Sequence, residues 1–143
     1  TEITAAIAGV QLDKADEIIS SRIELAHELS DMVKDFWVPP FEMGKHVFYH
    51  WAVRVPNRVW AWSYLLREGV PVRTGYTNPL HRVPAFKDFA SPCPIAEKAH
   101  DHDLLIFETC AWDPDKQQLN EMREIFKRAS EASIVYNASL PRT

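Results

Sequence analysis

The sequence predicts an α/β fold in which a long N-terminal spine helix is followed by a small sheet with covering helices. Apolar residues recur at helical spacing through residues 1–36, and segments rich in β-branched and aromatic residues then alternate with segments of helical pattern. The 143 residues are 46% hydrophobic and 25% charged, the balance of a globular chain that can bury one core. We expect residues 1–36 to form an interdomain helix and residues 37–143 a small C-terminal domain.

The first 36 residues carry a single apolar stripe. Thr1 can serve as N-cap, and the stretch contains Gly9 but no proline. A helix of this length exceeds the usual ~11 to 12 residues and is typical of a spine that joins two bodies. We therefore predict an unbroken helix over 1–36 whose stripe contacts another body, and we expect this chain to be the C-terminal portion of a larger protein. The stripe consists of Ile3, Ile7, Val10, Ile18, Leu25, Leu29, Met32 and Phe36.

Three later segments read as strands. Residues 46–55, 70–76 and 103–109 are rich in aromatic and β-branched residues, which favours a sheet of three or four strands. Prolines keep the segment 69–86 out of a helix interior, so it reads as a short strand that passes into an ordered loop.

Helices are expected between and after these strands. Asn57 is a suitable N-cap and Gly69 a suitable stop for the first, and a short helix is expected over 93–102. The closing helix has Asp113 as its predicted N-cap and Pro114 at its first position.

The composition argues against two classes of partner. A net charge of −4 and a pI near 5.8 provide no general basic field, and no apolar run approaches the ~20 residues of a membrane span. We therefore expect no nucleic-acid partner and no membrane association. Cys93 and Cys110 form no C-x-x-C pair, which suits a reducing compartment, and a cytoplasmic location is expected.

Histidines are the most tempting metal ligands. On a strand, His100 and His102 would present two imidazoles on one face, and His46 and His50 would also share a face. No third ligand follows at a recognisable spacing, so we expect no metal site and interpret these residues as polar surface or satisfied histidines. Glycine-rich phosphate loops and the G-x-S-x-G setting of a serine nucleophile are also absent from the sequence.

Four stretches in this order carry a specific resemblance: TEITAAIAGVQLDKADEIISSR, HVFYHWAVRV, GYTNPLHRVPAF and CPIAEKAHDHDLLIF. Together they resemble the C-terminal part of the DegT/DnrJ/EryC1/StrS aminotransferases, over essentially the whole chain. That family uses pyridoxal phosphate to place amino groups on nucleotide-linked keto-sugars and on aminocyclitol precursors.

The resemblance implies the small domain of a fold-type I aminotransferase. The family's Schiff-base lysine and other cofactor-binding residues would then lie in an N-terminal domain or a companion chain outside this sequence, and a homodimer is expected. Lys45 stands out in FEMGKH, but its context is not that of the family's lysine, and we interpret it as a turn residue. No catalytic residue is therefore expected in this chain, which would work with a keto-sugar and an amino donor.

By the same resemblance, the segment after the second strand faces the substrate. Tyr76, Asn78 and His81 are the candidate substrate-binding residues, with Arg73 and Arg82 as possible partners for an anion. Their chemistry agrees, since arginine suits a carboxylate or phosphate, and tyrosine and histidine can hydrogen-bond hydroxyl groups. The alternative is a proline-stiffened loop in which Tyr76 and His81 only pack.

The chain departs from the family pattern in two places. Gly75 stands directly before Tyr76, where many members have histidine, and the strand that usually ends in L-P reads IFETCAW. A second hypothesis follows, in which the chain is a non-catalytic α/β module that retains the fold and only binds a partner or ligand.

Overall fold

The computed structural model describes residues 1–75, 78–109 and 114–139, with 133–139 described by their backbone only. Its sheet has three strands in the order β1-β3-β2. Strand β3 (Leu104–Phe107) pairs antiparallel with both β1 (Trp51–Arg54) and β2 (Val72–Arg73). The α/β class and the small sheet expected from the sequence are therefore confirmed.

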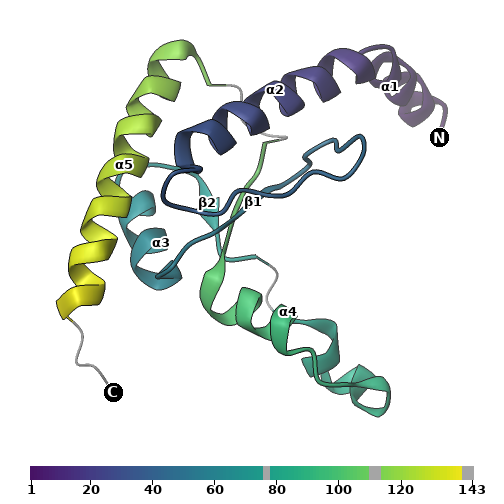
Figure 1. Cartoon of the computed structure of the whole chain (residues 1–143). Coiled ribbons are helices and arrows are strands. Elements are labelled where there is room, and N and C mark those ends of the chain that lie inside the picture. The colour runs from purple at the N-terminus through teal and green to yellow at the C-terminus, as the bar shows by residue number, and fades with distance from the viewer. Residues whose placement is uncertain (76–77, 110–113, 140–143) are drawn as a thin grey trace.

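One face of the sheet is covered by helices and forms the core (Figure 1). Trp51 on β1 contacts the ring of Phe107 on β3, with ring centroids 5.2 Å apart, and Phe107 in turn contacts Phe126 at 5.5 Å. Because side chains alternate along a strand, Ile106 points to the opposite face, away from these rings. The core cluster draws on helices α2 (Ala15–Val33), α3 (Arg58–Arg67) and α5 (Lys116–Ser139).

The prediction of one unbroken helix over 1–36 is wrong. Helix α1 (Glu2–Asp13) ends at Lys14, whose φ of −97° and ψ of 1° lie outside the helical region, and α2 then runs only to Val33. Lys14 occupies the stripe position between Val10 and Ile18, so the apolar pattern lapses there. Every residue of α1 is exposed, and no buried contact holds it in line with α2 (Figure 1).

The first strand is shorter than predicted, because residues 46–50 are not part of it. Phe48 has a φ of +43°, which no strand accommodates, and its N–H donates to Nδ1 of His46 at 2.9 Å. The Phe48 side chain is nevertheless buried, and its carbonyl accepts from the buried hydroxyl of Thr109. Core packing thus holds a local turn where the pattern indicated a strand.

Helix α3 begins and ends as the sequence predicts. The Asn57 side chain accepts from the N–H of Trp60 at 3.2 Å, which caps the helix. Gly69 has a φ of +80°, and the following N–H of Val70 donates to the carbonyl of Leu65 at 2.9 Å. This is a Schellman motif, in which glycine tolerates the left-handed position.

The segment between β2 and β3 forms an arm that extends from the body of the domain (Figure 1). It contains two short 3₁₀ turns, η1 (Leu80–Arg82) and η2 (Pro84–Phe89), then α4 (Pro94–Lys98) and a wider turn, η3 (Ala99–Asp103). The short helix expected over 93–102 is therefore confirmed at α4, whereas the 3₁₀ turns were not predicted.

Helix α5 begins later than predicted. Its N-cap is Asp115, whose side chain accepts from the N–H of Gln118 at 2.8 Å, while the Gln118 side chain accepts from the N–H of Asp115 at 2.9 Å. This reciprocal pair is a capping box. Pro114 precedes the helix instead of opening it, and Asp113 lies outside the described residues.

Candidate functional site

A cavity of about 690 Å³ lies between the segment after β2, the helical pair α4 and η3, and the face of β3 that is not covered by helices. Its walls are mostly apolar and include Leu80, Leu104 and Ile106, while Asn78 and His100 supply polar groups. An apolar pocket with a few polar groups is typical of a site for a small molecule.

The structure distributes the sequence-predicted site residues over separate places. Asn78 lines the cavity, and Tyr76 lies outside the described residues. His81 and Arg82 lie together on η1 and contact the α4–η3 segment, whereas Arg73 lies apart at the end of β2. Their binding roles remain a prediction.

Gly75 occupies a position that disfavours the histidine found there in many family members. Its φ of +92° is in the region that suits glycine, and a Cβ atom would meet Cδ1 of Ile106 at 3.5 Å. The added atom would fit in ordinary contact, so the backbone angle is the obstacle. Glycine in place of histidine at position 75 therefore coincides with a sharp backbone turn at the wall of the cavity.

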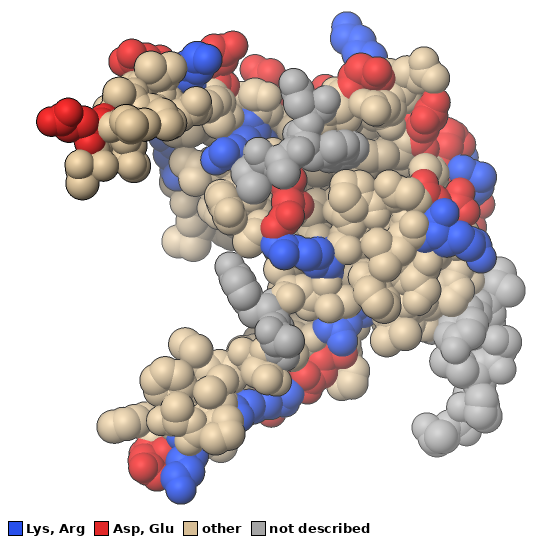
Figure 2. All heavy atoms as spheres, turned by 180° about the vertical axis from the view of Figure 1, so that it is seen from behind, with Lys and Arg blue, Asp and Glu red and all other residues tan. Residues whose placement is uncertain are grey.

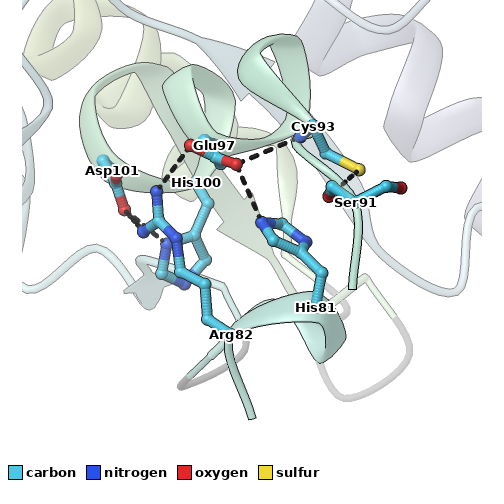
Figure 3. Close-up of polar contacts among 7 residues, drawn as sticks. All are labelled: His81, Arg82, Ser91, Cys93, Glu97, His100 and Asp101. Carbon is cyan, nitrogen blue, oxygen red and sulfur yellow. Dashed lines mark hydrogen bonds and ion pairs between the residues drawn. The ribbon is translucent and has the colours of Figure 1, made fainter. Parts of the chain in front are cut away.

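Glu97 is the centre of a polar cluster that joins η1 to α4 (Figure 3). Its Oε1 lies 3.0 Å from Nε2 of His81 and accepts from the N–H of Cys93 at 3.1 Å. Its Oε2 lies 3.2 Å from the guanidinium of Arg82. Arg82 also donates to Oδ1 of Asp101 at 2.8 Å, so one arginine bridges two acidic side chains.

These contacts favour the charged forms of the cluster. The hydrogen bond from Arg82 and then that from His100 hold the pKa of Asp101 well below its usual range. The Cys93 N–H, followed by Arg82, lowers the pKa of Glu97. The same pairs, led by Asp101, raise the pKa of Arg82. At neutral pH Arg82, Glu97 and Asp101 are therefore charged and paired with one another.

Removal of the arginine should reverse these shifts. In an Arg82→Ala variant, we expect the pKa of Asp101 to rise toward its ordinary 3.8 and that of Glu97 toward 4.5, in a ¹³C NMR titration of the carboxyl groups. A carboxyl group whose pKa is lower in the folded than in the unfolded state stabilises the fold at pH values above its unfolded pKa. This stabilisation is lost as the pH falls through its folded pKa. The attachment of the arm should thus weaken only below about pH 4.5. Arg54→Ala is the control, because Arg54 pairs with Asp103 instead, and equal pKa values in wild type and Arg82→Ala would contradict the prediction.

A second cluster forms where the ends of the three strands meet. Glu108 follows β3, pairs with Arg73 at the end of β2, and lies 3.7 Å from Nε2 of His50, which precedes β1. The register that places Trp51 opposite Phe107 brings these residues together. Sequence analysis assigned no role to Glu108, because the cluster depends on strand pairing that no local pattern contains.

The structure does not place His100 and His102 on a strand, the arrangement in which they were considered as metal ligands. His100 and His102 lie in the turn η3 instead of on a strand, and Nδ1 of His100 contacts Asp101 at 2.9 Å. Across residues 1–75, 78–109 and 114–139, no three His, Cys, Asp or Glu side chains are grouped to hold a metal ion. No helix in the same ranges is long and apolar enough to cross a membrane.

Comparisons with known proteins support the resemblance found in the sequence. The model of the DegT/DnrJ/EryC1/StrS aminotransferase family matches residues 1–119. No curated protein sequence matches the chain.

Solved structures are similar in fold. An aminotransferase of this family from Brucella abortus aligns with 83% of this chain and 33% of its own, with a TM-score of 0.74 and 17% identity. DesV from S. venezuelae, solved with a ketimine intermediate, aligns with 89% of this chain and 36% of its own, with a TM-score of 0.77 and 22% identity. The aminotransferase TlmJ from Streptoalloteichus hindustanus aligns with 90% of this chain and 36% of its own, with a TM-score of 0.75 and 23% identity. The chain thus spans about a third of the length of these structures.

Proposed function

Since this chain belongs to the DegT/DnrJ/EryC1/StrS aminotransferase family, we propose that it is the C-terminal portion of a pyridoxal-phosphate-dependent aminotransferase. Its substrate would be a nucleotide-linked keto-sugar or an aminocyclitol precursor. The observation that carries the proposal is the family match over residues 1–119, together with a fold that corresponds to the small domain of such enzymes. In this proposal the chain supplies substrate-side and interface residues, and another part of the enzyme supplies the Schiff-base lysine.

The lysines support that division of labour. A Schiff-base lysine must readily lose its charge, which requires burial or a nearby cation to lower its pKa. Lys34 shows the opposite, because its hydrogen bond with Asp31 raises its pKa. The residues of this chain therefore do not fit the covalent site of pyridoxal phosphate. All of its lysines are described and exposed: Lys14, Lys34, Lys45, Lys87, Lys98, Lys116 and Lys127.

The cavity beside β3 supports the substrate-side role. The polar group of Asn78 lines it, Gly75 turns the chain into it, and Tyr76 follows directly in sequence. A sugar carries many hydroxyl groups, which amide, phenol and imidazole groups can hydrogen-bond. We assign Tyr76, Asn78 and His81 to the sugar.

Exposed apolar side chains support a role for a further body, either the lysine-bearing domain, a companion chain or a second copy. Ile3 and Ile7 on α1 are 78% and 60% exposed, and Phe89 and Ile95 on the arm are each 87% exposed. Figure 2 shows α1 and the arm as two projections with open space between them, and the arm carries mostly uncharged atoms. Large apolar side chains exposed to this degree on both projections suit contact with another body.

Activity of the assembled enzyme tests the proposal. The chain is produced together with the lysine-bearing domain, and amino transfer to nucleotide-linked keto-sugars is measured with bound pyridoxal phosphate as a second readout. Asn78→Ala should raise KM for the sugar about tenfold and leave the cofactor content unchanged, because a lost hydrogen bond to substrate weakens binding only. Asn120→Ala, an exposed asparagine on α5, is the matched control. An assembly that binds no cofactor and transfers no amino group would instead support the non-catalytic module.

A further inference from the structure

We propose that Glu97 is a positioning residue that orients His81 toward the substrate and fixes η1 on the arm. The proposal rests on the function proposed above and adds to it a residue for which sequence analysis found no role, although Glu97 lies within the CPIAEKAHDHDLLIF stretch. Three contacts converge on the single carboxylate of Glu97 (Figure 3).

The carboxylate of Glu97 is itself held in place. Cys93 is the N-cap of α4, and its N–H donates to Oε1 of Glu97 one helical turn later. The backbone carbonyl of Cys93 also accepts from the N–H of Glu97 at 2.8 Å. Because Oε1 of Glu97 accepts from the backbone at the start of α4, this contact orients the carboxylate independently of η1.

The contact with Glu97 decides which ring nitrogen of His81 carries the proton. An ionised carboxylate only accepts hydrogen bonds, and the pKa of Glu97 is lowered, so Nε2 of His81 must be the donor. In the neutral imidazole, Nδ1 is then an acceptor. Within the described part of the chain, Nδ1 of His81 has no hydrogen-bond partner. His81 can therefore accept a hydrogen bond from a hydroxyl group of the substrate.

Arg82 has a different role in this arrangement. Its guanidinium contacts Glu97 and Asp101, and each carboxylate offsets its positive charge. A substrate anion would have to compete with both. Arg82 thus attaches η1 to α4 and η3, and Arg73, which pairs with Glu108 alone among the described acidic residues, is the better partner for an anion.

NMR of the histidine side chain tests the contact without any assay of activity. In the neutral form of His81 in the wild-type chain, ¹⁵N chemical shifts should place the proton on Nε2 and leave Nδ1 unprotonated. In Glu97→Ala the two tautomers should both be populated, whereas Glu124→Ala, an exposed glutamate on α5, should match wild type. A neutral wild-type His81 whose proton lies on Nδ1 would overturn the proposal.

Kinetics of the assembled enzyme test the consequence. Glu97→Ala should raise KM for the sugar about tenfold while kcat changes less than about threefold, and Glu97→Gln, which keeps an acceptor oxygen for His81, should recover most of the loss. In a His81→Ala background, Glu97→Ala should change KM by less than about twofold, because Glu97 acts through His81. Additive effects of the two substitutions, or an unchanged KM in Glu97→Ala, would overturn the positioning role. A wild-type assembly without amino transfer would overturn the proposed function itself, and the NMR measurement would still decide the contact.

Discussion

The chain of 143 residues, produced alone, is expected to bind pyridoxal phosphate at most weakly and to transfer no amino group. The expected effect is a complete loss of activity relative to the assembled enzyme, because amino transfer needs a lysine amine that forms an imine with the cofactor and moves protons. Every lysine here is exposed, and Lys34 is additionally paired with Asp31. An exposed amine lacks the burial that favours the neutral, reactive form.

The measurement is cofactor retention after gel filtration, followed by borohydride reduction and intact mass. The assembled enzyme is the positive control and should carry one cofactor per lysine-bearing site. Stoichiometric labelling of the isolated chain that a single substitution such as Lys45→Ala removes would contradict the assignment of the lysine to another part of the enzyme.

Replacement of Trp51 by alanine should destabilise the domain by about 3 to 5 kcal/mol. Trp51 is fully buried, contacts the ring of Phe107, and donates its indole N–H to the hydroxyl of Ser30 at 2.9 Å. The substitution removes an aromatic ring that joins the sheet to α2 and leaves a cavity that packed neighbours fill only in part.

Urea unfolding followed by circular dichroism gives the change in the free energy of unfolding. Phe89→Ala is the matched control, since Phe89 is exposed on the arm and its loss should cost less than about 0.5 kcal/mol. Equal midpoints for Trp51→Ala and wild type would show that this ring does not organise the core.

Several elements were predictable because their signals are local. Asn57 and Gly69 bound α3 through contacts within a few residues of each end, and these depend on side-chain and backbone chemistry alone. The third strand was predictable from its continuous apolar run. The family resemblance likewise needed only the order of four stretches, and the match over residues 1–119 confirmed it.

Local signals failed where packing competes with them. Residues 46–50 have strand-like composition, but burial of the Phe48 side chain maintains a turn with a positive φ. The stripe on 1–36 indicated one helix, yet its α1 portion is fully exposed and the helix ends at Lys14. In both places the sequence pattern reflects the conformation that the residues prefer locally. The conformation that forms depends also on which tertiary contacts are present or missing.

The sequence by itself determined the α/β class, both ends of α3 and the family, and it predicted a substrate-facing segment that carries Asn78, His81 and Arg82. Only the tertiary structure decided how these residues are held. Glu97 lies 16 residues from His81 along the chain, and Glu108 lies 35 residues from Arg73, yet both pairs are in contact. Contacts over such separations depend on strand register, which burial of the core sets, and on how the arm folds back on itself, and no local pattern contains either.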